Sequence, residues 1–297
     1  MELATGFGWP PYRKKNMHRK TIELIEAAYN VLAEYHPMTV RQVYYQLVSR
    51  HVIENKPSEY QKVSRILTDS RKNQFIPWQW IEDRVRQPRT VSMWQDLPDF
   101  MGTVKHAYRK DIWNDQPVYL EVWLEKDALS GVFADITERY GITLVVGRGY
   151  NSWSAYKEAA SRFAIDKPAF ILYFGDFDPS GEDIVRALRE SLDFFETSPE
   201  IIKVALTLED VKEYNLPPDF AKKTDTRSKA FIKKNGDMAV ELDALPMQVL
   251  QAKIETSIKN VLDMDAFTAT LQAEERERAE LEQDRKSTRL NSSHRMP

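Results

Sequence analysis

The sequence contains no cysteine in its 297 residues, which excludes disulfides and thiolate metal sites. It also lacks any apolar run near the roughly 18–20 residues that a membrane-spanning helix needs, so we expect no membrane segment. Residues 1–16 hold neither the apolar stretch nor the small-residue cleavage site of a secretory signal. From these absences we expect a cytoplasmic protein, and the length suits two modest domains.

Charge is distributed unevenly along the chain. Residues 1–90 hold 15 Lys and Arg against 9 Asp and Glu, a net charge of +6, whereas residues 91–297 hold 27 against 36, a net charge of -9. A basic front half joined to an acidic back half is typical of a DNA-gripping module followed by a carboxylate-rich metal site. Solvated faces that segregate by chance remain the alternative explanation.

Two helices are predicted near the N-terminus, after a basic leader at residues 1–17. Apolar residues at helical spacing predict the first helix over residues 22–35, which stops before Pro37. Thr39 and Gln42 form a T-x-x-Q capping box that predicts the start of a second helix. The apolar stripe of that helix consists of Val40, Val43, Tyr44, Leu47 and Val48.

A third helix and a wing are predicted to complete a winged helix-turn-helix domain over residues 18–90. Ser58 is expected to cap the third helix, and residues 75–78 to form a short strand that leads into the wing. The last helix of such a domain commonly enters a major groove. We therefore expect DNA contacts from the basic residues of the helix and wing: Lys62, Arg65, Arg71, Lys72, Arg84, Arg86 and Arg89.

The pattern changes after Pro117, where strands and helices alternate. This alternation predicts an α/β fold class with a parallel sheet over residues 117–262, whose ligands bind beyond the carboxyl ends of the strands. The predicted strands are 118–124, 142–146, 169–174, 201–206 and a short one at 238–242, and the helices between them are 128–140, 152–163 and 181–195, with a closing helix before residue 262.

Two further segments lack a clear pattern. Residues 91–116 carry no periodicity and are interpreted as a packed linker between the domains. Residues 263–297 are expected to form a charged tail, in which residues 272–286 are at best a solvated helix. Its last dozen residues, 286–297, are typical of read-through of a cloning adaptor rather than native coding sequence, and no function is assigned to them.

Acidic residues follow two of the predicted strands. Glu125 ends the first strand, and Asp176 and Asp178 follow the third, so all three lie at one edge of the sheet. Carboxylates that converge on loops suit Mg²⁺ or Mn²⁺, which take oxygen ligands. Helix caps are the alternative interpretation, and Asp183 is expected to be one. An EF-hand is excluded because its twelfth position is Ala187, and an aspartyl-phosphate phosphatase would place Asp-x-Asp after the first strand.

Glu125 together with Gly-Asp-Phe-Asp-Pro-Ser-Gly at 175–181, in this strand–helix order, resembles the Toprim domain of topoisomerases, primases and related nucleases. The nearest resemblance, over about residues 18–262, is to the type IIB topoisomerase A subunit and the meiotic double-strand-break transesterase. It implies Mg²⁺ or Mn²⁺ bound by Glu125, Asp176 and Asp178, with DNA as substrate. It also implies a homodimer that shares its active sites and a separate ATPase partner subunit. The resemblance also suggests Glu241 and Asp243 as outer-shell acids. Lys126 and Arg148 are expected at the same loop edge, where they would neutralise a phosphate, and a solvated Lys126 is the alternative.

The same family uses the second Tyr of an Arg-x-x-Tyr-Tyr segment as its nucleophile, and residues 41–45 read Arg-Gln-Val-Tyr-Tyr. At 100° per residue Tyr44 falls inside the apolar stripe, whereas Tyr45 lies off the core beside Arg41. An exposed Tyr45 with Arg41 one turn before it is suited to attack a phosphodiester, with Glu125 in the catalytic set. A surface Tyr without chemistry explains the same pattern.

Three functions therefore stay open. The first is a Mg²⁺-dependent DNA-cleaving transesterase that uses Tyr45. The second is a Toprim metal nuclease in which water is the nucleophile. The third is a non-catalytic DNA-binding module whose acids stabilise loops.

Overall fold

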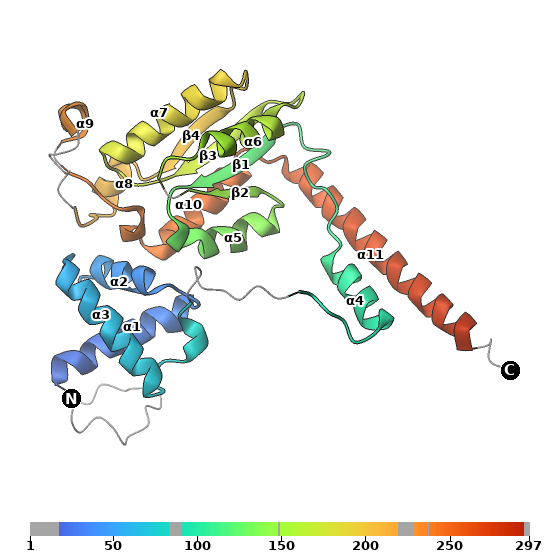
Figure 1. Cartoon of the computed structure of the whole chain (residues 1–297), viewed down its shortest axis with the longest axis horizontal. Helices are drawn as coiled ribbons and strands as arrows, with labels where there is room; N and C mark the ends of the chain where they lie inside the picture. Colours follow the sequence, from blue (N-terminus) through green and yellow to red (C-terminus); the bar gives the residue numbers. More distant parts are fainter. Residues whose placement is uncertain (1–17, 83–90, 148, 219–227, 237, 294–297) are drawn as a thin grey trace.

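The structure, a computed structural model, describes residues 18–82, 91–147, 149–218, 228–236 and 238–293 (Figure 1). The basic leader and four of the predicted site residues, Arg84, Arg86, Arg89 and Arg148, lie outside these ranges. In the described part of the chain, no helix has the length and apolar character needed to cross a membrane.

The N-terminal unit packs three helices, α1 (Arg19–Tyr35), α2 (Val40–Ser49) and α3 (Pro57–Lys72), around one apolar core. The predicted capping box is confirmed, because the Thr39 side chain accepts from the Gln42 backbone and Gln42 reciprocates. The predicted Ser58 cap is wrong. Lys56 occupies the cap position and Pro57 opens the helix, where a residue without a backbone N–H loses nothing.

The segment after α3 is not the predicted strand. Phe75 and Ile76 are buried in a turn, and η2 (Trp78–Trp80) is a single 3₁₀ turn. One parallel bridge between Met38 and Ile81 is the extent of strand pairing in this part of the described chain. The wing itself falls on residues outside the described ranges, so the winged helix remains a prediction.

The second unit is built on a parallel sheet, which confirms the predicted α/β class. Its strands β1 (Tyr119–Leu124), β2 (Thr143–Val146), β3 (Ala169–Phe174) and β4 (Glu200–Ala205) lie in the order β2-β1-β3-β4. The register pairs Leu124 with both Val146 and Phe174. The carboxyl ends of β1, β2 and β3 therefore form one level edge.

Helices cover both faces of the sheet. On one face, residues of η3 (Asp127–Leu129), α5 (Ser130–Arg139) and α10 (Met247–Lys259) share an apolar core with Leu120, Val122 and Leu124. On the other, α6 (Trp153–Phe163) and α7 (Pro179–Phe194) pack on Trp123 and Tyr173. Strand residues alternate between the two cores, as the pleat requires.

The segment after β4 differs most from the sequence-based expectation. It adds α8 (Leu208–Glu213) and α9 (Ser228–Asn235), neither of which was predicted. The predicted strand at 238–242 is reduced to one antiparallel bridge between Phe177 and Val240, followed by η4 (Leu242–Ala244). This bridge brings the 240–244 segment back across the carboxyl edge of the sheet.

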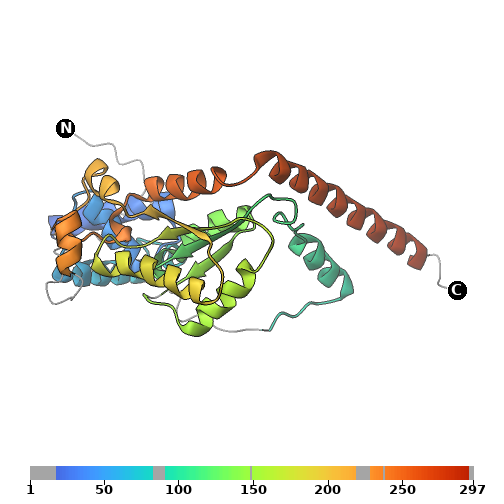
Figure 2. The ribbon, with the colours of Figure 1, turned by 90° about the horizontal axis from the view of Figure 1, so that it is seen from above.

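The linker and the tail form an arm that projects from the body (Figures 1 and 2). The linker contains α4 (Leu97–Ala107), which has no buried residue, so the prediction of a packed linker is wrong for this stretch. The tail forms the helix α11 (Met264–Ser293). This helix includes residues 286–293, which belong to the stretch that was predicted to lack periodicity. Contacts of Tyr108 and Lys110 with Glu277 join the two segments.

The N-terminal unit contacts the α/β unit through α2. This helix packs against η4 and η3, and Met247 at the start of α10 is part of the N-terminal core. Gln46 of α2 also donates to the carbonyl of Leu245 across 3.4 Å. As a result, one side of α2 faces the carboxyl edge of the sheet.

Candidate active site

Glu125 and Asp176 lie side by side at the ends of the paired strands β1 and β3. The Asp176 backbone N donates to Glu125 Oε2 across 3.0 Å, and the Tyr173 hydroxyl lies 3.3 Å from the same oxygen. Gly175 leaves the space for this carboxylate, since a Cβ there would collide with Glu125 Oε2. Burial raises the pKa of Glu125, and Asp178 raises it further.

Asp176 is only 8% exposed and is held by several groups. Its Oδ1 accepts from the Leu242 backbone N at 2.8 Å and lies 3.0 Å from the ammonium of Lys126. Burial raises the pKa of Asp176 to about 7, against the opposing effect of Lys126. Lys203, which the sequence-based analysis missed, donates to the Asp176 carbonyl at 3.1 Å. A Lys between the apolar residues Ile202 and Val204 of β4 was the available signal.

Asp178 has a different role from its two predicted partners. It is the N-cap of α7 and accepts from the Gly181 backbone N at 2.6 Å. The helix-cap interpretation therefore holds for Asp178, and the predicted cap Asp183 is wrong because it lies inside α7 and pairs with Arg186. In the described part of the chain, no three His, Asp or Glu side chains are arranged to hold a metal ion.

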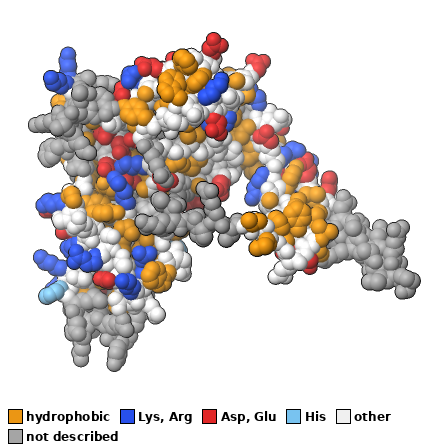
Figure 3. All heavy atoms as spheres, in the orientation of Figure 1, with side chains coloured by type: hydrophobic (Ala, Val, Ile, Leu, Met, Phe, Trp, Pro, Cys, Tyr) orange, Lys and Arg blue, Asp and Glu red, His pale blue; other side chains and the backbone are white. Residues whose placement is uncertain are grey.

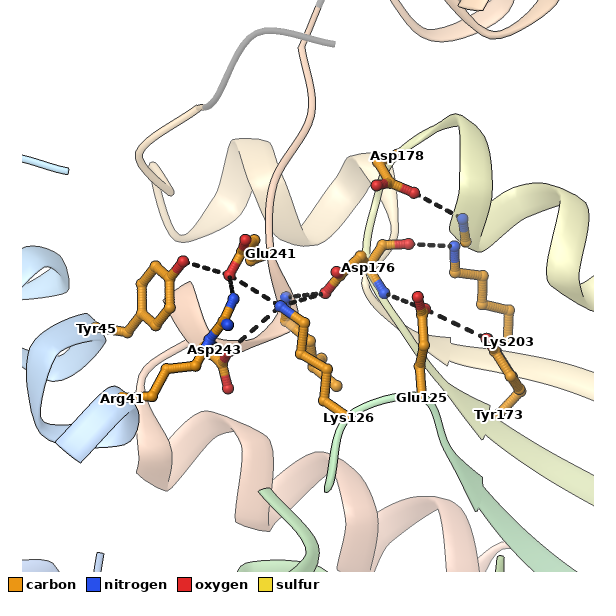
Figure 4. A network of polar contacts seen from close by, with 12 residues as sticks. Arg41, Tyr45, Glu125, Lys126, Tyr173, Asp176, Asp178, Lys203, Glu241 and Asp243 are labelled. Atoms are coloured by element: carbon orange, nitrogen blue, oxygen red, sulfur yellow. Dashed lines mark hydrogen bonds and ion pairs between the residues drawn. The ribbon is translucent and has the colours of Figure 1, made fainter. Parts of the chain in front are cut away.

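A second group of acids faces the first from the segment that crosses the sheet edge (Figure 4). The Lys126 ammonium lies 2.9 Å from Glu241 and 3.3 Å from Asp243, in addition to its contact with Asp176. Although burial lowers the pKa of Lys126, the three carboxylates raise it above its ordinary value, so the side chain stays charged. Lys126 thus joins the ends of β1 and β3 to the 241–243 segment.

Arg41 approaches the same acids from α2. Its guanidinium lies 2.6 Å from Glu241 and 3.3 Å from Asp243. Burial would raise the pKa of Glu241, but Lys126, Tyr45 and Arg41 lower it to about 2. Asp243 has no exposed side-chain surface, yet its Oδ1 has no hydrogen-bond partner. Two cations therefore serve three carboxylates, Asp176 included, and leave one buried oxygen unsatisfied.

Tyr45 completes this group. Its hydroxyl donates to Glu241, and the Arg41 guanidinium lies 5.6 Å from the ring centroid. The predicted exposure is wrong, since Tyr45 is only 6% exposed. A helical wheel takes account only of how α2 packs in the three-helix core. The 241–247 segment, about 200 residues away in the sequence, covers the side of α2 that carries Tyr45, and so buries it. Burial and the hydrogen bond to Glu241 raise the pKa of Tyr45 above its ordinary value.

No protein-family model and no curated protein matches this chain. The resemblance to Toprim proteins therefore rests on the motif residues themselves.

A cavity of about 310 Å³ opens at this edge. Its lining includes the carboxylate residue Glu125 and the two cations Arg41 and Lys126, with Asp127, Ala128 and Gly149 around them. Cations beside a carboxylate suit a phosphate group that is bridged by a metal ion. The cavity thus offers room for a ligand beside Arg41 and Glu125, two of the three predicted catalytic residues.

The predicted DNA contacts of α3 lie on the surface of the N-terminal unit. Lys62, Arg65 and Lys72 are exposed, and Arg71 is half-buried. Lys and Arg side chains are visible over this unit in Figure 3. The structure does not place these residues in the acid cluster, so they belong to a separate surface.

The acids fit a hard divalent cation through two carboxylates rather than three. Mg²⁺ is commonly held by one or two carboxylates and completes its shell with water and phosphate oxygens. Glu125, which lines the cavity, and Asp176, which lies beside Glu125, supply such a pair. Asp178, fixed as a helix cap, is the least suited of the three predicted ligands.

Proposed function

We propose that this protein is a Toprim-type enzyme that breaks DNA strands with the help of Mg²⁺ or Mn²⁺. The observation that supports the proposal is a cavity lined by Arg41, Glu125 and Lys126, residues from segments far apart in the chain. Tyr45 joins this group through Glu241, and Asp176 joins it through Lys126. Such a combination of a phenol, cations and carboxylates suits phosphodiester chemistry. The basic surface of α3 would hold the DNA backbone.

In this proposal Glu125 and Asp176 hold the metal ion, which supplies Lewis-acid stabilisation of the phosphate when bound. Arg41 and Lys126 bind the phosphate oxygens. Tyr45 would form the new bond to phosphorus while the bond from phosphorus to the 3′ oxygen breaks. The phenolic proton would pass to a base, and the 3′ oxygen would take up a proton from solvent and leave as a hydroxyl. Glu241, which accepts the hydrogen bond of Tyr45, is the nearest acceptor for that proton.

One observation favours water as the nucleophile. The Tyr45 hydroxyl is buried and bound to Glu241, and the pKa of Tyr45 is raised, so its phenolate is disfavoured in this arrangement. A water molecule in the cavity would be free of both the hydrogen bond to Glu241 and the raised pKa of the phenol. The resemblance to enzymes that share active sites between protomers still makes a homodimer part of the proposal.

Incubation of supercoiled DNA with the full chain and Mg²⁺ or Mn²⁺ tests both routes. With Tyr45 as nucleophile, protein remains attached to a 5′ end until protease treatment, and Tyr45→Phe abolishes cleavage. With water as nucleophile, free ends appear and Tyr45→Phe cleaves normally. Asp176→Ala should abolish cleavage by either route.

Failure of the wild type to cleave with any divalent metal, while it binds DNA in a salt-sensitive manner, would leave the non-catalytic module as the function. Unchanged DNA binding by Asp176→Ala would agree with that result. Arg186→Gln, which alters an exposed ion pair of α7 away from the acid cluster, is a matched control and should cleave as the wild type does.

A further inference from the structure

Arg71, in the last turn of α3, has no anionic partner among the residues that the structure describes. Its Nε is buried and has no hydrogen-bond partner, and Arg71 forms no ion pair within the described residues. Burial lowers the pKa of Arg71, and no nearby carboxylate opposes that effect. Because burial of part of a charged group is unfavourable unless the group is paired, this half-buried guanidinium is suited to bind an anion of a ligand.

The contact that Arg71 does make is with an aromatic ring. Its guanidinium carbon lies 4.9 Å from the centroid of the Trp78 ring. Trp78 belongs to the short turn η2 and is 57% exposed, although Trp is normally a largely buried residue. The Arg71 side chain thus holds the indole in place while much of its surface stays open to solvent.

Further cations lie on the same helix. Arg65 and Lys72 are exposed, and their spacing of seven residues puts them on one face of α3. Neither forms an ion pair within the residues that the structure describes, whereas Lys62 pairs with Glu59 at 3.2 Å. The end of α3 therefore combines unpaired positive charge with an exposed aromatic ring.

We propose that Arg71 and Trp78 form a nucleotide-binding corner, in which Arg71 binds a phosphate and the open surface of Trp78 stacks on an unpaired base. Exposed aromatic rings beside cations are the means by which proteins hold single-stranded nucleic acids. Bases in an intact duplex are already stacked, so the corner selects DNA with unpaired nucleotides. This inference rests on the proposed function and specifies the form of DNA that the N-terminal unit prefers.

Binding of a labelled oligothymidine and of a matched duplex to the full chain, followed by fluorescence anisotropy in EDTA, tests the corner without cleavage. Trp78→Ala should weaken single-strand binding by about tenfold or more and leave duplex binding within about twofold. Trp78→Phe keeps an aromatic ring and should retain most of the affinity. Arg71→Gln should weaken binding and reduce the salt dependence by about one ion.

Trp153→Ala is the matched control, because Trp153 is 60% exposed on α6, outside the N-terminal unit. The inference is overturned if Trp78→Ala loses no more single-strand affinity than Trp153→Ala, or if duplex binding falls by the same factor. It is also overturned if polyglutamate competes as well as oligothymidine, since the corner would then bind any polyanion.

The outcomes separate this inference from the proposed function. A wild type that binds duplex but not single strands contradicts the corner alone. A wild type that binds neither contradicts both. Normal single-strand binding without cleavage in Mg²⁺ supports the corner and contradicts the enzyme. Trp78→Phe keeps the test decisive should Trp78→Ala fail to fold.

Discussion

The cations at the sheet edge and the cation at the end of α3 differ in how they are paired. Arg41 and Lys126 lie within 3.3 Å of carboxylates from two or three different residues each. Arg71 is half-buried, yet its described contact is an aromatic ring rather than a carboxylate. Desolvation of a charge is unfavourable at both places, but among the described residues carboxylates offset it only at the first.

This difference separates two uses of positive charge. Arg41 and Lys126 join the N-terminal unit to the 241–243 segment and to the sheet, so their substitution should lower the free energy of unfolding. Arg71 forms no comparable ion pair among the described residues, so its substitution should lower the affinity for a ligand. Substitutions at the two places therefore distinguish the two uses of positive charge.

Lys126→Met should lower the free energy of unfolding by about 3–5 kcal/mol, because it leaves Asp176, Glu241 and Asp243 buried with Arg41 alone. Urea denaturation at pH 7 measures the loss. Arg71→Met is the matched comparison and should change stability by less than about 1 kcal/mol, since it removes only the contact with the Trp78 ring and leaves no carboxylate of the described residues unpaired. Equal losses for the two variants would remove the distinction between paired and unpaired cations.

Glu241→Gln should destabilise the protein in a pH-dependent manner. The pKa of Glu241 is about 2 in the folded chain against 4.5 ordinarily, so its charged form contributes on the order of 3 kcal/mol above pH 4.5. This contribution is lost as the pH falls through 4.5 toward 2. The stability gap between wild type and Glu241→Gln, followed by urea denaturation, should therefore be full at pH 7 and narrow steadily below pH 4.5. A gap that is constant with pH would contradict the ion-pair origin.

Gly175→Ala tests the sheet edge without altering a charge. The added Cβ would meet Glu125 Oε2 and the Tyr173 ring, so we expect a loss of about 1–3 kcal/mol and displacement of the Glu125 carboxylate. Thermal unfolding and DNA cleavage measure the two effects. Gly102→Ala is the control, because nothing lies within 4 Å of its added Cβ and α4 should gain stability from it. Equal behaviour of the two variants would show that Gly175 does not position Glu125.

Local patterns predict most of the α/β unit. Strand β3 has the predicted bounds, Ala169–Phe174, because a short run of apolar residues ended by Gly175 admits no other element. The capping box of α2 and the placement of Glu125 and Asp176 at one edge also follow from neighbouring residues. These features depend on interactions within a few positions, or on the fixed direction of parallel strands.

The remainder depends on contacts between distant segments. Tyr45 is buried by residues about 200 positions away, which no helical wheel can include. Asp178 rather than Asp183 caps α7 because the helix begins at Pro179, a choice that is set by where the strand releases the chain. The acids Glu241 and Asp243 join the site through Lys126, and the resemblance to Toprim proteins was the signal that indicated them.

The smallest predicted change in stability comes from the N-terminal caps of α2 and α3, the helices that carry Arg41 and Arg71. Thr39→Ala removes the capping box of α2, the helix of Arg41, and should lower stability by about 1 kcal/mol. Ser58→Ala is its counterpart on α3, the helix of Arg71, and should change stability by less than about 0.5 kcal/mol because Pro57, not Ser58, opens that helix. Thr39→Ser keeps the capping hydroxyl and should retain the wild-type stability.

DNA cleavage by the same variants tests the role of this cap in the site. If Thr39→Ala also weakens DNA cleavage while Ser58→Ala does not, the start of α2 helps to hold Arg41 and Tyr45 against the acids. If neither variant changes cleavage, the ion pairs of Arg41 with Glu241 and Asp243 suffice to hold that helix in place.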